Sequence, residues 1–253
     1  MVIEKYADEI IEKYKSGLSC EKIANIYGVN KTTIYRFLKY KNIDMRKYND
    51  YKKYKIDEHV FDILNTEEQY YILGLFYADG FNISNKNEFG IALSGEDLYM
   101  IENIQKFFKT DRPIRHYYPS NKGQEVHELR LNSKILSDRL IDLGCLCNKS
   151  LILKFPNFLE DKFMKDFIRG YFDGDGSVYN INKNGKRIIF MGTYDFCEGL
   201  KKVLSDFLDI KSFISKNNKI YYVRFSRKKD VNKFFHWLYD DATIFLSRKY
   251  NKF

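Results

Sequence analysis

The sequence lacks the marks of several protein classes. No apolar run reaches the ~18 residues that a membrane-spanning helix needs, and the N-terminal stretch MVIEKYADEIIEKYKSG is amphipathic, unlike the continuously apolar core of a signal peptide. The four cysteines include one close pair, Cys145 and Cys147, without the second pair that a zinc site of this type needs. We therefore expect reduced thiols, a cytoplasmic setting and no membrane partner.

Signatures of nucleotide-driven and histidine-based chemistry are also missing. The sequence has no glycine-rich phosphate loop, which argues against an ATP-driven function. The histidines are scattered and match neither a ββα-metal signature nor a zinc cluster. A structural role is therefore expected for each of them: His59, His116, His127 and His236.

Positive charge is abundant and unevenly distributed. The chain of 253 residues has a formal net charge of +9, which suits a polyanionic partner. Residues 1–55 carry 13 lysines and arginines against 7 acidic residues, so most of the excess lies in this fifth of the chain. This concentration favours a nucleic-acid-binding segment near the N-terminus.

Residues 1–46 have the pattern of a three-helix domain. An amphipathic helix over 2–15 precedes the stretch CEKIANIYGVNKTTIYRFLK, in which Ser19 is a good N-cap and Gly28 makes a turn before a last helix opening at Asn30. This stretch resembles the helix-turn-helix units of resolvases and transposases, whose second helix enters the major groove. Its outward residues are candidate DNA contacts: Asn30, Lys31, Thr32, Tyr35 and Arg36. A protein-binding module is the alternative, and residues 47–64 are expected to be a basic linker.

Two similar motifs follow, YILGLFYADG at residues 71–80 and FIRGYFDGDG at 167–176. Each is apolar and carries two small residues four apart, so each predicts a helix with a bare face on which another helix packs closely. The small residues are Gly74 and Ala78 in the first motif and Gly170 and Gly174 in the second.

Each motif ends in an aspartate followed by a glycine. Gly80 and Gly176 suit the left-handed position that ends a helix, which places Asp79 and Asp175 at helix C-termini. If the helices pack through their bare faces, the two carboxylates converge. Like charges so close favour partial protonation or a bound cation, and the arrangement indicates a divalent metal site.

Both motifs resemble the signature of the LAGLIDADG homing endonucleases, with the nine positions at Ile72–Gly80 and Ile168–Gly176. The resemblance implies an α+β fold in which two αββαββα half-domains, residues 65–150 and 151–253, form a pseudo-twofold saddle of antiparallel sheets. It also implies a monomeric, site-specific endonuclease that makes double-strand breaks in DNA. Mg²⁺, or Mn²⁺ in its place, would be held by Asp79, Asp175 and the backbone carbonyls of Ala78 and Gly174.

The segments after each motif repeat one plan. Period-two stretches predict strands at 89–93, 113–118, 125–131, 177–182, 187–191, 213–215 and 220–225, and the helices expected between them span 98–108, 134–143, 196–208 and 229–239. Arg130 lies 51 residues after Asp79, and Arg224 lies 49 after Asp175. Basic residues on or beside these strands are candidate DNA contacts: Arg115, Arg130, Lys134, Arg187, Arg224 and Arg227, with Tyr117, Lys183 and Lys216 beside them.

The sequence departs from the family pattern at two points, of which one matters. Members carry a Lys or Gln near the end of the second strand of each half, where this chain has Leu93 and Ser94, or Gly192 and Thr193. Either another basic group substitutes or cleavage is slow or lost. Position six of the first motif is Tyr77 instead of the usual acid, which we weigh lightly. A cleavage-inactive DNA-binding regulator and an RNA maturase acting on a mobile intron therefore stay open as alternatives.

Overall fold

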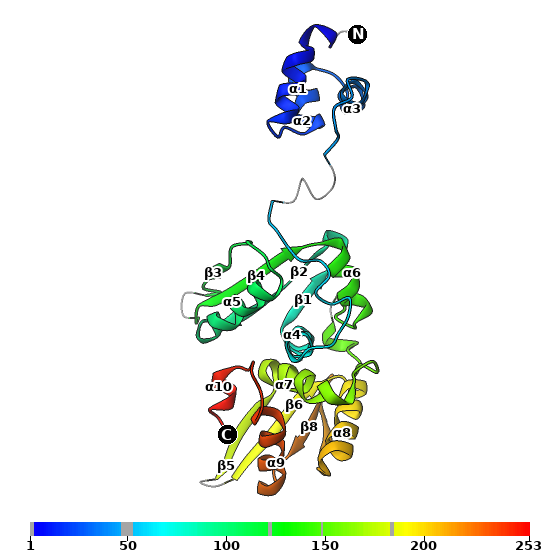
Figure 1. Ribbon diagram of the computed structural model, residues 1–253. Coiled ribbons are helices and arrows are strands. Elements are labelled where there is room, and N and C mark those ends of the chain that lie inside the picture. The colour runs from blue at the N-terminus through cyan, green and yellow to red at the C-terminus, as the bar shows by residue number, and fades with distance from the viewer. Residues whose placement is uncertain (1–2, 47–52, 121–122, 148, 183–184) are drawn as a thin grey trace. The chain divides into compact units, whose positions relative to one another are not determined.

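The computed structural model describes residues 3–46, 53–120, 123–147, 149–182 and 185–253, in two compact units, Met1–Lys53 and Tyr54–Phe253 (Figure 1). Within the described residues, every helix is too short or too polar to span a bilayer. All four cysteines are free thiols.

The first unit is a small helical domain. It contains the short 3₁₀ helix η1 (Glu4–Tyr6) and the helices α1 (Ala7–Lys15), α2 (Cys20–Tyr27) and α3 (Lys31–Tyr40). The Ser19 hydroxyl accepts a hydrogen bond from the Lys22 amide at 3.2 Å, and Gly28 turns the chain after α2 with a φ of 63°. Its fully buried core includes Ile10, Ile23 and Ile34. The predicted helix-turn-helix is present at α2 and α3.

The second unit contains two halves with the same order of elements. The first half consists of α4 (Glu67–Ala78), β1 (Gly80–Ile83), β2 (Glu88–Ser94), α5 (Leu98–Phe107), β3 (Arg115–Tyr117), β4 (Val126–Asn132) and α6 (Lys134–Asp142). The second half consists of α7 (Met164–Asp175), β5 (Ser177–Asn182), β6 (Gly185–Gly192), α8 (Tyr194–Leu208), β7 (Phe213–Asn217), β8 (Ile220–Phe225) and α9 (Lys228–Tyr239), followed by α10 (Ser247–Tyr250).

The sheets confirm the predicted repeat. The strand orders are β1-β2-β4-β3 and β5-β6-β8-β7, and every pairing is antiparallel. Figure 1 shows the two sheets on opposite sides of the helix pair α4 and α7. The α+β fold with two αββαββα halves is therefore the fold that the sequence predicts.

The motif helices α4 and α7 pack at backbone distance. A Cβ atom built on Gly74 would lie 2.1 Å from the carbonyl oxygen of Phe167, and one on Gly170 would lie 2.0 Å from that of Tyr71. A Cβ on Gly174 would lie 2.3 Å from the Cβ of Ala78. The small residues thus allow the two helices to approach closely, and the contacts on the two sides are equivalent.

The expected left-handed conformation of Gly80 and Gly176 is wrong. Gly176 has φ −72° and ψ 154°, and Gly80 is the first residue of β1. Close contact with an aromatic residue four positions earlier requires glycine here. A Cβ would lie 2.6 Å from Cδ1 of Phe76 at the first position and 2.1 Å from Cδ2 of Phe172 at the second.

The second part of the predicted 47–64 linker packs against the first half. Residues 47–52 lie outside the described residues, but residues 54–64 belong to the second unit. Phe61 is fully buried against Phe107 and Phe108, and the Gln69 amide donates hydrogen bonds to the carbonyls of Val60 and Ile63. Burial of Phe61 fixes this segment to the first half, so residues 54–64 are not a tether.

Each sheet has one apolar face and one open face. Because side chains alternate along a strand, Phe89, Leu129 and Phe190 point into the core, whereas Arg130 and Arg224 lie on the opposite faces. We call these opposite faces the first and second open faces. Strand β1 was missed by the sequence analysis because its four residues follow α4 directly and are too few to show a period.

Candidate functional site

The two motif aspartates come together at the C-terminal ends of α4 and α7. Asp79 is the C-cap residue of α4, and Asp175 is the last residue of α7. A Cβ on Gly174 would lie 2.9 Å from Oδ2 of Asp79, so the last turn of α7 lies directly against the Asp79 carboxylate. The structure thus places both carboxylates in one site, and each is half-buried.

Burial makes ionisation of both carboxylates costly. Desolvation, assisted by the charge of Asp175, raises the pKa of Asp79 to about 6. Desolvation also raises the pKa of Asp175, although Lys149 and Lys249 act to lower it. A pair of half-buried carboxylates with raised pKa values binds a cation favourably, because the cation offsets their mutual repulsion.

Two lysines that the sequence analysis missed lie beside this pair. Nζ of Lys149 donates hydrogen bonds to the carbonyl oxygens of Phe76 and Gly80. Nζ of Lys249, on α10, donates to those of Phe172 (3.4 Å), Gly174 (3.2 Å) and Gly176. Both lysines therefore bind carbonyls at the end of a motif helix, three residues before and one residue after the aspartate.

Both lysines are held in a poorly solvated environment. Burial lowers the pKa of Lys149, and it lowers the pKa of Lys249 to about 8. The carboxylates of Asp79 and Asp175 act in the opposite direction on Lys149. The site therefore combines two acids and two cations whose charge states depend on one another.

The positions where the family resemblance predicted a basic residue have other roles here. Leu93 is buried, and the Ser94 hydroxyl donates to Asp97 at 3.3 Å. The Thr193 hydroxyl accepts from the Phe196 amide at 3.1 Å and so caps α8. Lys149 and Lys249 supply the positive charge instead. One feature of the sequence could have indicated these two residues, because a lysine occurs at a similar separation after each aspartate, 70 residues after Asp79 and 74 after Asp175.

Position six of each motif anchors the segment that leads to the corresponding lysine. The Tyr77 hydroxyl donates to the carbonyl of Leu143 at 2.6 Å. Asp173 is fully buried and accepts hydrogen bonds from Tyr71 (2.8 Å), Tyr239 (2.7 Å) and the Leu246 amide (2.6 Å). Burial raises the pKa of Asp173 to about 6, against the lowering effect of these donors. This position therefore matters more than the sequence analysis assumed.

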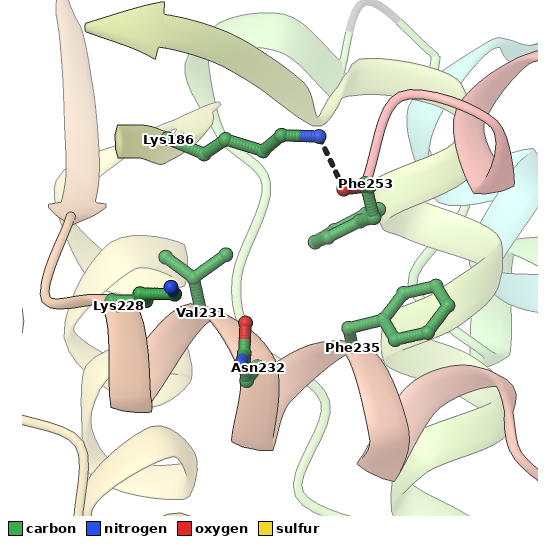
Figure 2. Close-up of a pocket in the computed structure, with 6 residues that line it drawn as sticks. All are labelled: Lys186, Lys228, Val231, Asn232, Phe235 and Phe253. Carbon is green, nitrogen blue, oxygen red and sulfur yellow. Dashed lines mark hydrogen bonds between the residues drawn. The ribbon is translucent and has the colours of Figure 1, made fainter. Parts of the chain in front are cut away.

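The C-terminal segment that carries Lys249 is fixed at a pocket of about 190 Å³ (Figure 2). Nζ of Lys186 donates to the carbonyl oxygens of Lys252 (2.6 Å) and Phe253. The Phe253 ring lies 5.0 Å from that of Phe235 and 5.8 Å from that of Phe172, between centroids. These contacts keep α10 against the end of α7.

The donor set of the carboxylate site fits a hard divalent cation. Two carboxylates converge, and the other acceptors at the helix ends are backbone carbonyls, so all candidate ligands are oxygens, as Mg²⁺ and Mn²⁺ prefer. The carbonyl of Gly174, one of the predicted ligands, accepts the hydrogen bond from Lys249. The carbonyl of Ala78 is at the C-terminus of α4, where helical carbonyls lose their partners.

The second open face carries a cluster of cations. A pocket of about 330 Å³ is lined by Arg187, Lys211, Arg224 and Arg227, together with the exposed ring of Phe213. No ion pair joins these four cations to any acid among the described residues. Three of the predicted DNA contacts are therefore brought together, and Lys211 joins them.

The first open face differs, because its arginines are already paired. Arg130 donates to Glu128 at 2.5 Å and to Glu88 at 2.7 Å, and Arg115 contacts Glu128 at 3.3 Å. The Tyr117 hydroxyl also points to Glu128, at 3.5 Å. The two arginines and two glutamates together carry no net charge.

The remaining predicted contacts are spread over the molecule. Lys134 begins the covering helix α6 and pairs with Asp138, so it lies away from the open face. Lys216 lies over the Tyr221 ring at 5.5 Å, and Lys183 lies outside the described residues. The side chain of Asn30 caps α3 of the first unit by accepting a hydrogen bond from the Thr32 amide. The other four predicted contacts on this helix are exposed: Lys31, Thr32, Tyr35 and Arg36.

Two family models match the chain and agree with the sequence analysis. Residues 162–237 match the LAGLIDADG-like domain, and residues 8–46 match the helix-turn-helix, Psq domain. Among curated proteins, the DNA-directed RNA polymerase subunit Rpo1C of Methanocaldococcus jannaschii is 29% identical over an alignment of 128 residues that covers 47% of this chain. The match spans 14% of the length of that subunit.

Solved structures show a similar fold. The LAGLIDADG meganuclease I-AabMI, bound to uncleaved DNA, has a TM-score of 0.50 and 13% identity, covering 72% of this chain and 87% of its own. Full-length DUF199/WhiA from Thermatoga maritima has a TM-score of 0.51 and 16% identity, covering 77% of this chain and 62% of its own. At these identities the likeness concerns the fold, and the activity has to be argued from the site.

Proposed function

We propose that the protein is a homing-type, divalent-metal-dependent endodeoxyribonuclease, because residues 162–237 match the LAGLIDADG-like domain and the helix α7 within them ends at Asp175, one of the two carboxylates. It binds one long site in double-stranded DNA as a monomer and cuts both strands. The observation that carries this proposal is the pairing of Asp79 and Asp175 at the contact of α4 and α7, with one lysine beside each helix end.

Asp79 and Asp175, with the carbonyls of Ala78 and Gly174, would hold Mg²⁺, and Mn²⁺ can replace it. When bound, the metal lowers the pKa of a coordinated water and neutralises charge on the leaving oxygen of the phosphodiester. Lys149 and Lys249 hold positive charge beside the same point, where a phosphate carries negative charge. With a pKa near 8, the Lys249 ammonium can also exchange a proton close to neutral pH.

The pseudosymmetry suits two cuts in one duplex. Equivalent contacts place one aspartate and one lysine at the end of each motif helix, so each pair can serve one strand. The two open faces would follow the DNA to either side, and the cations around Arg224 on the second face would contact phosphates. Helix α3 of the first unit, residues 31–40, would contact the major groove and lengthen the site.

The proposed domains correspond to these two roles, contact with the major groove and cleavage. Residues 1–46 form the helix-turn-helix domain, and residues 65–150 and 151–253 form the two halves of the nuclease. We infer that the protein acts in the cytoplasm, at the nucleoid, because its proposed target is double-stranded DNA. Encoding within a mobile intron is part of the same proposal, because a homing enzyme spreads its own coding element.

A DNA-binding protein that no longer cuts is the second candidate. It is favoured by one observation, the structural use of Leu93, Ser94 and Thr193 at the positions where the family carries a basic or amide residue. In that case the open faces and α3 retain their binding role. An RNA maturase that binds its intron RNA through the same faces is a further form of this candidate.

Selection from a randomised duplex library tests the proposal. The full chain is incubated with the library in Mg²⁺ or Mn²⁺, and bound and cleaved molecules are sequenced, with intron RNA as a competitor in a parallel arm. We expect one long site that is cut on both strands. Asp79→Asn and Asp175→Asn should abolish double-strand cleavage and retain affinity, whereas Asp206→Asn, an exposed residue on α8, should cut normally.

Selective binding without cleavage in either metal would reject the nuclease and leave the DNA-binding protein. Preferential binding of intron RNA would favour the maturase. Cleavage that persists in both Asp79→Asn and Asp175→Asn would remove the carboxylate pair from the mechanism.

A further inference from the structure

A second cluster of metal-ligand side chains lies outside the carboxylate site, at the edge of the first sheet. Nδ1 of His116 on β3 and Nδ1 of His127 on β4 are 2.7 Å apart, and the two residues are directly paired across the strands. Glu125, just before β4, completes a group whose three ligand atoms lie within 4.8 Å of one another. We propose that these three residues bind a Zn²⁺ ion.

The donor types match zinc. Zn²⁺ binds imidazole nitrogen and carboxylate oxygen at roughly 2.0–2.2 Å and prefers four ligands, so two histidines and one glutamate leave one position for water. Tetrahedral geometry at these bond lengths separates neighbouring ligand atoms by about 3.3 Å. Small rotations of the two rings around the present 2.7 Å contact reach that spacing. The site differs in kind from the all-oxygen carboxylate site, which suits harder cations.

The surroundings fix which ring nitrogen of His127 is available. His127 is 3% exposed, and its Nε2 faces Gly95, since a Cβ there would lie 3.8 Å from it. Its Nδ1 therefore faces His116. At this distance the two imidazole nitrogens share a proton, and a bound cation would replace that proton once the rings turn apart to the spacing of tetrahedral ligands. Because His116 is exposed, an ion can enter from solvent without opening the fold.

The second half lacks this cluster although its strands pair in the same way. His127 lies three residues before Arg130, and the residue three before the equivalent Arg224 is Tyr221. The strand partner of Tyr221 is Lys216, as that of His127 is His116, so Tyr221 and Lys216 occupy the equivalent positions. The fold therefore does not require imidazoles at this point. Two of the four histidines, which are scattered along the sequence, meet here.

A bound Zn²⁺ would stabilise a short edge strand. Strand β3 has three residues, and His116 lies between Arg115 and Tyr117, which point to the other side of the sheet. Cross-linking His116 to His127 would hold those two side chains on the first open face. Zinc would in this way fix part of the surface independently of any chemistry at the carboxylate pair.

Metal titration of the full chain tests the site. Chelator-treated protein is titrated with Co²⁺ and Zn²⁺ in excess Mg²⁺, which occupies all-oxygen sites. We expect one equivalent of Co²⁺ to bind and to show the visible absorption of a four-coordinate site with nitrogen and oxygen ligands. Zn²⁺ should displace this Co²⁺ and should raise the Tm of the protein. Amide exchange in β3 should slow on binding.

The variants separate this site from its alternatives. His116→Ala alters an exposed side chain and should fold, and it should weaken Zn²⁺ binding by more than the roughly 10–100-fold that loss of a residue supporting a ligand costs. Glu125→Gln should weaken it as well. Matched controls are His59→Ala and His236→Ala, exposed histidines beside Asp62 and Asp240, and Cys147→Ser.

Two outcomes would overturn the proposal. If the protein does not bind Co²⁺ or Zn²⁺ when one equivalent of metal per chain is added, His116 and His127 are only a hydrogen-bonded pair that shares one proton. If binding is unchanged in His116→Ala but lost in a control variant, the ion binds elsewhere.

Discussion

The two halves of the second unit are alike at the helix pair and different on their sheets. Gly74 contacts the carbonyl of Phe167 as Gly170 contacts that of Tyr71, and Lys149 and Lys249 bind equivalent carbonyls. The open faces share only their topology, since Arg130 is paired with two glutamates while Arg224 lies among other cations. The two halves are thus symmetric at the contact of α4 and α7, where they form one site together. They are not symmetric on the open faces, which belong to one half each.

The largest effect is expected where the halves are most alike. Gly74→Ala and Gly170→Ala each place a methyl group about 2 Å from a backbone oxygen, which no side-chain rotation relieves. Overpacking typically costs roughly 1–3 kcal/mol in the free energy of unfolding, and contacts this short put both variants at the upper end of that range. Chemical denaturation should give similar losses for the two variants. The control is Gly95→Ala, whose methyl group would meet only ordinary van der Waals contacts, so its free energy of unfolding should stay near that of the wild type. Unequal losses in Gly74→Ala and Gly170→Ala would contradict the symmetry of the helix contact.

Position six should respond unequally in the two halves. Asp173→Ala leaves three buried donors without their acceptor and should cost roughly 3 kcal/mol, whereas Tyr77→Phe removes one hydrogen bond and should cost about 1 kcal/mol. Denaturation curves measure both losses. Equal losses would show that Asp173 contributes no more than a single hydrogen bond.

The buried carboxyl of Asp173 also predicts a dependence of stability on pH. Its pKa is about 6 in the folded protein and has its ordinary value near 3.8 in the unfolded chain, so the folded state binds the proton more tightly. Stability from this group is present below the unfolded value and falls as pH rises through about 6, by up to about 3 kcal/mol. Asp173→Asn should lose this part of the slope between pH 4 and 6. An unchanged slope would place the proton on another group.

Much of this organisation could be predicted from the sequence because it is local. The helix-turn-helix, the motif helices and most strands follow from periodicity and N-caps such as Ser19, and the two aspartates follow from a motif that occurs twice. The lysines could not be found in this way, because Lys149 and Lys249 reach the aspartates from distant segments that are irregular or only one turn long.

Two other features that the sequence analysis did not predict have the same physical origin. Gly80 and Gly176 looked like left-handed helix ends, but the reason for glycine is the ring of an aromatic residue four positions earlier. The ion pairs of Arg130 were not expected either, because Glu88 is 42 residues away in sequence, although it lies on the neighbouring strand β2, diagonally opposite Arg130. Both depend on the three-dimensional neighbours of a residue, which periodicity does not contain.

The difference between the open faces predicts unequal effects on DNA binding. Arg224→Ala should weaken binding and make the slope of log K against log salt shallower by about 0.9, the value for one phosphate contact. Arg130→Ala should change the slope less, because Glu88 and Glu128 already balance its charge. Glu128→Gln should strengthen binding by releasing Arg130 and Arg115. Binding isotherms at several salt concentrations measure these effects.

Lys134→Ala serves as the control in this series, because its side chain lies on α6 and pairs with Asp138. A loss of affinity in Lys134→Ala as large as that in Arg224→Ala would contradict the assignment of the DNA surface to the open faces.

Calorimetric titration with Mn²⁺ tests the carboxylate pair most directly, because it needs no knowledge of the DNA target. Binding requires Asp79 to lose its proton, so affinity should fall as pH drops through about 6, with protons released to buffer on binding. Asp79→Asn and Asp175→Asn should each abolish this binding, and Asp206→Asn should leave it intact. Mn²⁺ binding that survives both substitutions, or that releases no protons near pH 6, would contradict a metal held between α4 and α7.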